Sequence, residues 1–376
     1  MQRTIPCTIM RGGTSKGVYL LEKDLPPEGE ARDSLLLRLM GSPDLKQIDG
    51  LGGAASVTSK VAILAPSARE GIDVDYTFAQ VSIDKPVVSY AGNCGNISSG
   101  VGPFAIESGL VKTDSDNTTV HIFNTNTKKL MVENVQTPGG KVEYAGDFSI
   151  PGVPGTAAPV KVMVVDPAGT IGKGLLPTGK PVDVLDIPGF GKIEATIVDS
   201  ANPLVFVRAK DVGLTGIELP TEIDADADKL ELLESIRGEA ARMLGLVEDA
   251  KDSAWKTPGV PKMTIVAPPN AYVTSGGEEI AENKVDILGR MMSMQKAHPT
   301  YAMTGAMCTA SAAVVPGTIV YEAKRDSAEP TRLRIGQPGG VLDAGVDHTE
   351  NGGEVAIQNA YGFRTARLIM QGTAYC

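Results

Sequence analysis

The sequence predicts an α+β protein with two similar halves, each built from short strands around one buried helix. Three observations support this prediction. Short segments with strand character recur along the whole chain, separated by many of its 43 glycines and 25 prolines. Only a few segments show the spacing of apolar residues that is typical of helices. Finally, each half contains one apolar segment with a cysteine, and these two segments resemble each other.

The predicted strands come in two sets, each rich in β-branched residues and bounded by turn residues. The first set covers residues 3–13, 16–21, 60–67, 73–83, 119–127 and 129–137. The second set covers residues 192–200, 203–212, 262–268, 317–323, 332–340 and 353–360. Apolar residues recur at about 3.6-residue spacing, which predicts helices, in segments 31–41, 227–247 and 283–297.

A glycine- and proline-rich segment, residues 166–191, separates the two strand sets and predicts a crossing between domains. A chain of 376 residues also exceeds the size at which a single hydrophobic core usually stops growing. We therefore expect a first domain of residues 1–187, joined by the returning C-terminal strand at about 362–376. The second domain is expected to cover residues 188–361.

The two cysteine-bearing segments are residues 92–109 and 304–320. Each places a cysteine after glycine and small residues and continues with a segment too apolar for an exposed helix. Such a helix must be buried, so we expect one helix enclosed by strands in each half. A cysteine at a helix N-terminus would face unpaired N–H groups and the positive end of the helix dipole, which favour thiolates and bind carboxylates.

Composition excludes several classes of protein. The net charge of −10 and the pI near 5.0 argue against nucleic-acid and membrane-surface partners, which require a positive field. No segment reaches the roughly 18 consecutive apolar residues of a membrane span, and the N-terminus lacks the pattern of a signal peptide. The four cysteines form no CxxC pair and there are three histidines, so we expect free thiols, no metal site, no cofactor and a cytoplasmic location. The sequence leaves the oligomeric state open, and a homo-oligomer is compatible with it.

Cys94 has two interpretations from the residues alone. A free cysteine among small residues is more often a packing residue than a reactive one. The flanking segment "GNCGN" favours the second interpretation, because glycine and asparagine tolerate backbone conformations that allow a close approach to a ligand. The flanks of Cys308 do not decide between the two. Cys7, within a predicted strand, and Cys376, the last residue, are interpreted as structural.

Several segments together resemble the 2-methylaconitate cis–trans isomerase family, which includes 3-methylitaconate Δ-isomerase and 4-oxalomesaconate tautomerase. They are residues 9–20, 47–64, 73–83, 92–111, 152–160, 201–212 and 304–320. The resemblance runs in order from about residue 3 to the C-terminus. It implies the diaminopimelate epimerase-like fold, with two similar β-barrel-like domains, each around a central helix, and an active site in the cleft between them.

The resemblance also implies a catalytic pair. Diaminopimelate epimerases use two cysteines, one from each half, but the segment "CTASA" at Cys308 departs from the epimerase form "CGSG". In the isomerase family the second catalytic group is a lysine after a "GG…TSK" stretch, which here is Lys60. Without the resemblance, Lys60 would be interpreted as an exposed lysine at a strand end. We therefore expect Lys60 and Cys94 to be catalytic.

The substrate-binding candidates are groups that can hold carboxylates. The segment "RGGTSKG" offers a glycine turn with hydroxyl groups and positive charges, although it is compatible with a simple hairpin and lacks phosphate-loop spacing. Residues after each cysteine would supply donors at the starts of the two helices. The expected substrate-binding residues are Arg11, Thr14, Ser15, Lys16, Gly95, Asn96, Cys308, Thr309 and Ser311.

Two hypotheses from different classes follow. The first is a cofactor-independent isomerase that moves a proton and a double bond in a small unsaturated di- or tricarboxylate, most like methylitaconate or methylaconitate. An oxalomesaconate-type tautomerase or an aconitate isomerase is the alternative within the same family. The second hypothesis is a non-catalytic carboxylate-binding accessory protein, because resemblance to a family does not guarantee activity. The motifs do not choose among these substrates, since pocket shape decides such small differences.

Overall fold

The computed structural model describes residues 3–113 and 115–376. The chain folds into two compact units: unit 1, Met1–Met163 with Phe363–Cys376, and unit 2, Val164–Gly362. The predicted crossing segment, residues 166–191, packs within unit 2 near its N-terminal end, where Gly169 N donates to Asp199 O at 3.0 Å. The hydroxyl of Thr170 also donates to the Asp199 carboxylate, at 2.5 Å. The expected domain boundary after residue 187 stays a prediction.

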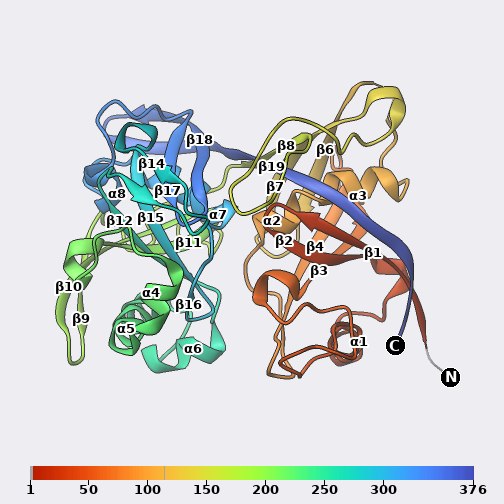
Figure 1. Ribbon diagram of the computed structural model, residues 1–376, viewed down its shortest axis with the longest axis horizontal. Helices are drawn as coiled ribbons and strands as arrows, with labels where there is room; N and C mark the ends of the chain where they lie inside the picture. Colours follow the sequence, from red (N-terminus) through yellow and green to blue (C-terminus); the bar gives the residue numbers. More distant parts are fainter. Residues whose placement is uncertain (1–2, 114) are drawn as a thin grey trace. The chain divides into compact units, whose positions relative to one another are not determined.

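Unit 1 contains a twisted sheet whose strands pair in the order β1-β2-β3-β4-β6-β7 (Figure 1). The strands are β1 (Thr4–Gly12), β2 (Ser15–Leu21), β3 (Lys60–Pro66), β4 (Val74–Val81), β5 (Val88–Ser89), β6 (Asn117–Asn124) and β7 (Lys129–Gln136). The successive pairs alternate between antiparallel and parallel, beginning and ending with an antiparallel pair. The C-terminal part of β19 (Glu354–Tyr375) pairs with β1, and β5 pairs with β4.

Helices cover both faces of the unit 1 sheet. Helix α1 (Glu30–Met40) packs on one face, where Val18 and Leu20 of β2 join its apolar residues in a buried cluster. Because side chains alternate along a strand, Gly17 and Tyr19 lie on the other face. That face carries the short helices α2 (Gly95–Ser98) and α3 (Val101–Glu107), since the Tyr19 hydroxyl donates to Ile97 O at 2.6 Å.

Unit 2 repeats this topology, with strands paired in the order β10-β11-β12-β15-β17-β18. The strands are β9 (Asp183–Ile187), β10 (Gly191–Ser200), β11 (Asn202–Arg208), β12 (Lys262–Ala267), β15 (Ile287–Ser293), β16 (Lys296–Ala297), β17 (Leu333–Gln337) and β18 (Gly340–Asn351). Antiparallel and parallel pairs alternate as in unit 1. A separate small hairpin consists of β13 (Tyr272–Val273) and β14 (Glu279–Ile280).

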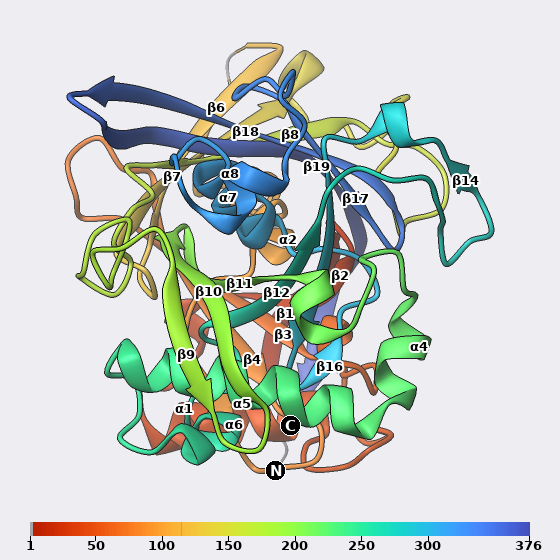
Figure 2. The same cartoon turned by 90° about the vertical axis from the view of Figure 1, so that its left-hand side faces the viewer.

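Figure 2 labels the helices of unit 2. In the order of elements along the chain, they occur at the same points as the helices of unit 1. Between β11 and β12 lie α4 (Pro220–Ala225), α5 (Ala227–Met243) and α6 (Ser253–Lys256), as α1 lies between β2 and β3. Between β15 and β17 lie α7 (Met303–Ala312) and α8 (Ile319–Ala323), as α2 and α3 lie between β4 and β6. All ten residues of α7 are buried, which confirms the predicted buried helix. No helix in the described part of the chain is long and apolar enough to cross a membrane.

Two predicted elements are wrong. Residues 283–297 do not form a helix, because the segment contains β15, which pairs with β12 on one side and β17 on the other. A central strand that is buried on both faces carries no alternation, so its apolar residues matched helical spacing by chance. Residues 317–323 do not form a strand: the side chain of Thr318 accepts a hydrogen bond from Tyr321 N and caps α8.

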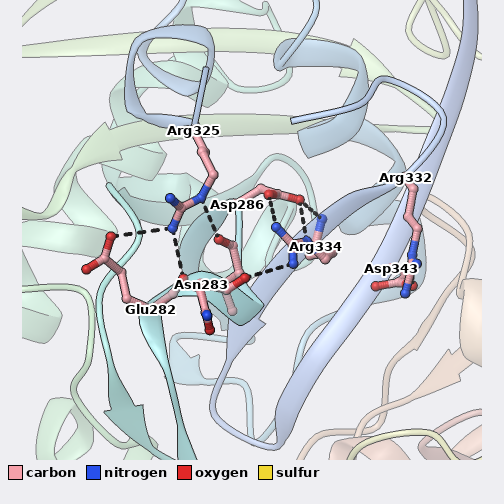
Figure 3. Close-up of polar contacts among 8 residues, drawn as sticks. Glu282, Asn283, Asp286, Arg325, Arg332, Arg334 and Asp343 are labelled. Carbon is pink, nitrogen blue, oxygen red and sulfur yellow. Dashed lines mark hydrogen bonds and ion pairs between the residues drawn. The ribbon is translucent and has the colours of Figure 1, made fainter. Parts of the chain in front are cut away.

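A group of ion pairs stabilises one edge of unit 2 (Figure 3). The buried carboxylate of Asp286 accepts two hydrogen bonds from the guanidinium of Arg334, at 2.6 and 3.0 Å, and one from Arg334 N at 2.8 Å. Arg325 donates to Glu282 O at 2.9 Å and to Val285 O at 3.3 Å. These contacts attach the residues before β15 to β17 and have a structural role, since every charge in them has a partner.

Candidate active site

Cys94 is the N-cap residue of α2, as the sequence predicts. Its backbone N donates to the side-chain oxygen of Asn93 at 2.7 Å, and its carbonyl oxygen accepts from Ser98 N at 2.8 Å and from the Ser98 hydroxyl at 3.0 Å. Gly92 has a φ of 73°, which is the left-handed region that glycine adopts most easily. Cys94 is partly exposed, and these contacts fix the backbone that carries its thiol.

Lys60 begins β3 and is buried, with 8% of its surface exposed. Its side-chain nitrogen lies 2.5 Å from Oε1 of Gln80 and 5.1 Å from the centre of the Phe78 ring. The Gln80 amide is itself fixed, since it donates to Ser56 O at 3.1 Å and Ser59 O at 2.8 Å. Among the residues that the structure describes, no carboxylate pairs with this lysine, so its partners are all neutral.

Lys60 and Cys94 belong to the same face of the unit 1 sheet. Lys60 is paired with Gly17 in the parallel register of β2 and β3, and Gly17 lies on the face that carries α2. A Cβ atom on Gly17 would lie 2.9 Å from Cδ1 of Ile97 and 2.9 Å from Lys60 O. The lack of a side chain at Gly17 therefore allows the start of β3 and α2 to approach each other closely.

The turn between β1 and β2 packs against the start of α2. Asn96 donates from Nδ2 to the Thr14 hydroxyl at 3.0 Å. A Cβ atom on Gly13 would lie 2.3 Å from Oδ1 of Asn96, and one on Gly12 would lie 2.4 Å from Asn96 O. The Ser15 hydroxyl is buried and has no hydrogen-bond partner among the described residues. Of the predicted binding residues, the structure thus brings Thr14, Ser15, Gly95 and Asn96 together beside Cys94.

Arg11 and Lys16 are not part of this group. Both alternate with residues of the α2 face and so belong to the opposite face of the hairpin. The guanidinium of Arg11 donates to Gly13 O at 3.0 Å and to the carbonyl and hydroxyl of Thr365, both at 2.9 Å. Arg11 therefore fixes the turn to β19. The predicted binding roles of Arg11 and Lys16 stay predictions.

Cys308 does not lie at a helix start, and the expectation that it does is wrong. Helix α7 begins at Met303, which places Cys308 in its interior, fully buried, with Sγ 3.5 Å from Val198 O. Burial raises the pKa of the Cys308 thiol well above its usual range.

Thr309 and Ser311 are also not donors at a helix start. Their hydroxyls donate to Gly305 O at 2.8 Å and Met307 O at 3.0 Å, four residues earlier in the helix. The predicted contact of Cys308, Thr309 and Ser311 with a substrate stays a prediction, but the helix position on which it was based is not correct.

Arg364 is a residue of this region that sequence reasoning missed. It lies on β19, is 3% exposed, and donates from Nε to Oδ1 of Asn96 at 3.1 Å. Burial lowers its pKa to about 10, and the nearby Cys94 acts in the opposite direction. No motif marks this position, because Arg364 is about 270 residues from Asn96 in sequence and only the return of β19 to unit 1 brings them together.

A buried carboxyl group lies beneath the central helices of unit 1. Glu133 of β7 is fully buried; Oε2 accepts from Gly102 N at 2.8 Å, and Oε1 has no partner within the described residues. Burial raises the pKa of Glu133 to about 8. Tyr19 and Tyr76 are buried nearby, and burial raises the pKa of each, with contributions from Cys94 and Glu133. Burial therefore favours the uncharged form of each of these groups.

The repeated topology and the central helices define a racemase- and epimerase-like fold. A solved structure of a hydroxyproline epimerase from Agrobacterium vitis superimposes with a TM-score of 0.60 at 13% identity, covering 100% of this chain and 94% of that one. At this identity the likeness concerns the fold alone. The predicted diaminopimelate epimerase-like α+β class is confirmed.

The family follows from comparisons of the whole chain. The family model described as "PrpF protein" matches residues 2–376, and the chain belongs to this family. It is 48% identical to a 3-methylitaconate isomerase from Eubacterium barkeri, covering 100% of this chain and 97% of the relative. It is 42% identical to a 2-methyl-aconitate isomerase from Shewanella oneidensis, with 99% and 96% covered. A crystal structure of a methylitaconate-delta-isomerase, also 48% identical, superimposes with a TM-score of 0.82 and covers 100% and 96%. These relatives confirm the predicted family resemblance.

Proposed function

We propose that this chain is an isomerase that moves a proton and a double bond in a small unsaturated di- or tricarboxylate, of the methylitaconate or methylaconitate type. The observation that carries the proposal is the placement of a buried lysine with neutral partners and a partly exposed cysteine on one face of the unit 1 sheet. Full-length relatives with isomerase names support the reaction class.

Lys60 is the proposed base. A primary amine accepts a proton only in its neutral form, and a carboxylate beside it would stabilise the ammonium instead. The amide oxygen of Gln80 positions the nitrogen without supplying a full negative charge. In the first step the amine takes a proton from the carbon next to the double bond, and the electron pair left behind spreads into the carboxylate as a dienolate.

Cys94 is the proposed acid for the second step. Its thiol gives a proton to the other end of the allylic system, the double bond takes its new position, and a thiolate remains. Transfer of the proton from the Lys60 ammonium to the thiolate, through solvent, restores both groups. The substrate gains and loses one proton, so no redox partner is needed. Hydrogen bonds from Cys94 N to Asn93 and from Ser98 to Cys94 O fix the backbone from which the thiol extends.

A two-cysteine epimerase reaction is less well supported. It requires a second thiol that can reach the substrate and lose its proton, whereas Cys308 is fully buried and its pKa is raised. The environment of the two thiols thus favours the lysine and cysteine pair over the pair of cysteines.

Proton exchange at carbon tests the reaction class directly. The pure protein is incubated in D₂O with methylitaconate, methylaconitate, aconitate and oxalomesaconate in turn, and NMR records deuterium uptake and product signals. An isomerase incorporates deuterium at an allylic carbon of at least one acid. A carboxylate-binding accessory protein exchanges none, and that result would overturn the proposal. Repeating the assay after dialysis against EDTA tests the expectation that no metal takes part.

A further inference from the structure

Arg364 differs from the other buried arginines of this protein in the partners of its guanidinium. Arg32 pairs with Glu22 at 3.1 Å, and Arg237 pairs with Glu234 at 2.6 Å. Arg290 has no carboxylate partner in the described part of the chain, but it donates to the three carbonyl oxygens of Glu218, Gly289 and Gly336. Arg32 and Arg237 thus have carboxylate partners and Arg290 has three carbonyl acceptors, although Nη1 of Arg32 and Nη2 of Arg290 are themselves buried without a hydrogen-bond partner among the described residues.

The guanidinium of Arg364 makes fewer contacts. Within the residues that the structure describes, it donates to Oδ1 of Asn96 at 3.1 Å and to Phe363 O at 2.9 Å, and it forms no ion pair. Nη2 has no hydrogen-bond partner among these residues. A cation that is 97% buried without a counter-ion is costly, so a protein retains one chiefly where an anion binds.

The surroundings of Arg364 supply the rest of an anion site. Asn96 connects it to the Thr14 hydroxyl, and the Ser15 hydroxyl is buried without a partner in the described residues. Gly13 makes room for this arrangement, because a Cβ atom there would lie 3.1 Å from Cδ of Arg364. Asn96, the partner of Arg364, lies two residues after Cys94 on α2, so the guanidinium is held beside the helix start that Cys94 caps.

We propose that Arg364 binds a carboxylate group of the substrate through the edge of its guanidinium that makes no contact with Asn96, next to Cys94. The inference rests on the proposed function for the identity of the ligand, a small dicarboxylate. Arg364 also fixes the side chain of Asn96, which in turn orients Thr14, so one residue from the C-terminal strand arranges the donors of the turn. A planar guanidinium suits a carboxylate because two parallel N–H groups meet its two oxygens.

Binding of malonate tests the inference without turnover. Calorimetric titration and thermal unfolding are measured for the full chain, for Arg364→Met and Arg364→Lys, and for the control Arg332→Met. Arg332 is an exposed arginine of unit 2 with an ion pair to Asp343 at 2.7 Å (Figure 3). We expect Arg364→Met to weaken malonate binding by about 10- to 100-fold. Arg364→Lys should weaken it by less, because an ammonium group keeps the positive charge but lacks the two parallel N–H donors of a guanidinium. The control should bind as the original chain does.

The stability of the ligand-free variants separates a binding role from a structural one. If Arg364 serves an absent anion, Arg364→Met removes a buried charge without a counter-ion, and the ligand-free protein keeps or raises its Tm. A clearly lowered Tm together with malonate affinity within about twofold of the original would overturn the inference. If Arg364→Met does not fold, Arg364→Gln decides the matter, because it also removes the charge while keeping an N–H donor for Asn96, and malonate affinity within about twofold of the original would overturn the inference in the same way.

The outcome is distinguishable from that of the proposed function. If the original chain exchanges deuterium into a substrate but the Arg364 variants bind malonate normally, the function stands and this inference fails. If no acid is isomerised while malonate binding still depends on Arg364, the anion site stands and the isomerase proposal fails.

Discussion

The central helices of the two units occupy equivalent positions in one repeated topology, but their cysteines have different environments. In unit 1 the cysteine precedes the helix as its N-cap, is partly exposed, and has Lys60, Asn96 and Arg364 on its side of the sheet. In unit 2 the helix begins five residues before Cys308, and the thiol is fully buried. The two helices therefore begin at different points relative to their cysteines. As a result Cys94 is partly exposed, whereas Cys308 is a buried packing residue.

The buried polar groups next to the central helices of the two units also differ in their hydrogen-bond partners. The interior next to α2 and α3 contains a carboxyl group with one unpaired oxygen, together with two buried tyrosines. The interior next to α7 contains hydroxyl pairs, Tyr301 with Thr309 at 2.8 Å and Ser200 with Ser311 at 2.7 Å, although buried atoms without a described partner, such as Thr264 Oγ1, also occur in unit 2. Satisfied pairs stabilise a core, whereas unpaired groups indicate a site with a function. The unpaired carboxyl group next to α2 and α3 is consistent with the proposal that unit 1 carries the reactive groups.

The largest expected effect is that of Lys60→Ala, which tests whether unit 1 supplies the base. Removal of a general base typically costs about 10²- to 10⁴-fold in rate. We expect the loss of kcat to lie near the upper end of this range, because the neighbouring side chains of Gln80 and Phe78 cannot act as a base in place of the amine. The measurement is the initial rate of isomerisation by NMR, with Lys85→Ala, which changes an exposed lysine of unit 1, as the control. A nearly normal kcat would show that Lys60 is not the base and that another residue removes the proton.

Cys94→Ser should have the next largest effect on the rate. Serine keeps a hydroxyl at the N-cap but is a far weaker acid than cysteine, so we expect a loss of about 10²-fold in kcat with analogue affinity largely kept. Labelling of the original chain with iodoacetamide, followed by mass spectrometry of the peptides, supplies an independent test. Cys94 should react much faster than Cys308, whose thiol is buried and has a raised pKa. Equal labelling of the two would contradict the assignment.

Glu133→Gln should change how stability depends on pH. The folded pKa of about 8 lies above the usual value near 4.3, so the folded state keeps a proton that the unfolded state releases. The contribution to stability is fully present below pH 4 and is lost as pH rises through 8, which amounts to roughly 3 to 5 kcal/mol. Glutamine cannot ionise, so the variant should lose less unfolding free energy between pH 6 and 9.

Urea unfolding of the original chain and of Glu133→Gln at each pH checks this prediction. The control is Glu350→Gln, which changes an exposed carboxylate of β18 and should leave the pH profile as it is. Parallel profiles for the original chain and Glu133→Gln would show that Glu133 titrates normally and that the core beneath α3 is not neutral.

The smallest effect is expected from Cys308→Ser. The serine hydroxyl occupies the same buried position near Val198 O and can donate to it, so we expect kcat within about threefold and a loss of about 1 kcal/mol in stability. The same rate assay and urea unfolding measure both quantities. If Cys308→Ser abolishes turnover while Lys60→Ala does not, the reaction uses an epimerase-type cysteine pair and the comparison between the two helices is reversed.

Most strands and two of the three helices were predictable from sequence, because β-branched segments bounded by glycine and proline, and amphipathic spacing in α1 and α5, are local signals. The segment 283–297 was not predictable, since a strand buried on both faces loses its alternation. Neither was the start of α7, because small apolar residues continue a helix in both directions from Cys308. The N-cap position of Cys94 was predictable from its glycine and asparagine neighbours.

The sequence by itself determined the α+β class, the buried central helices, and Lys60 and Cys94 as candidates, because these depend on local patterns and on long family motifs. Only the tertiary structure decided that Lys60 has neutral partners, that Cys308 is enclosed, that Glu133 lies beneath the central helices, and that Arg364 reaches Asn96. The physical reason is that burial and electrostatic environment depend on which distant segments pack together. A strand that returns from the end of the chain leaves no sign of its neighbours in its own sequence.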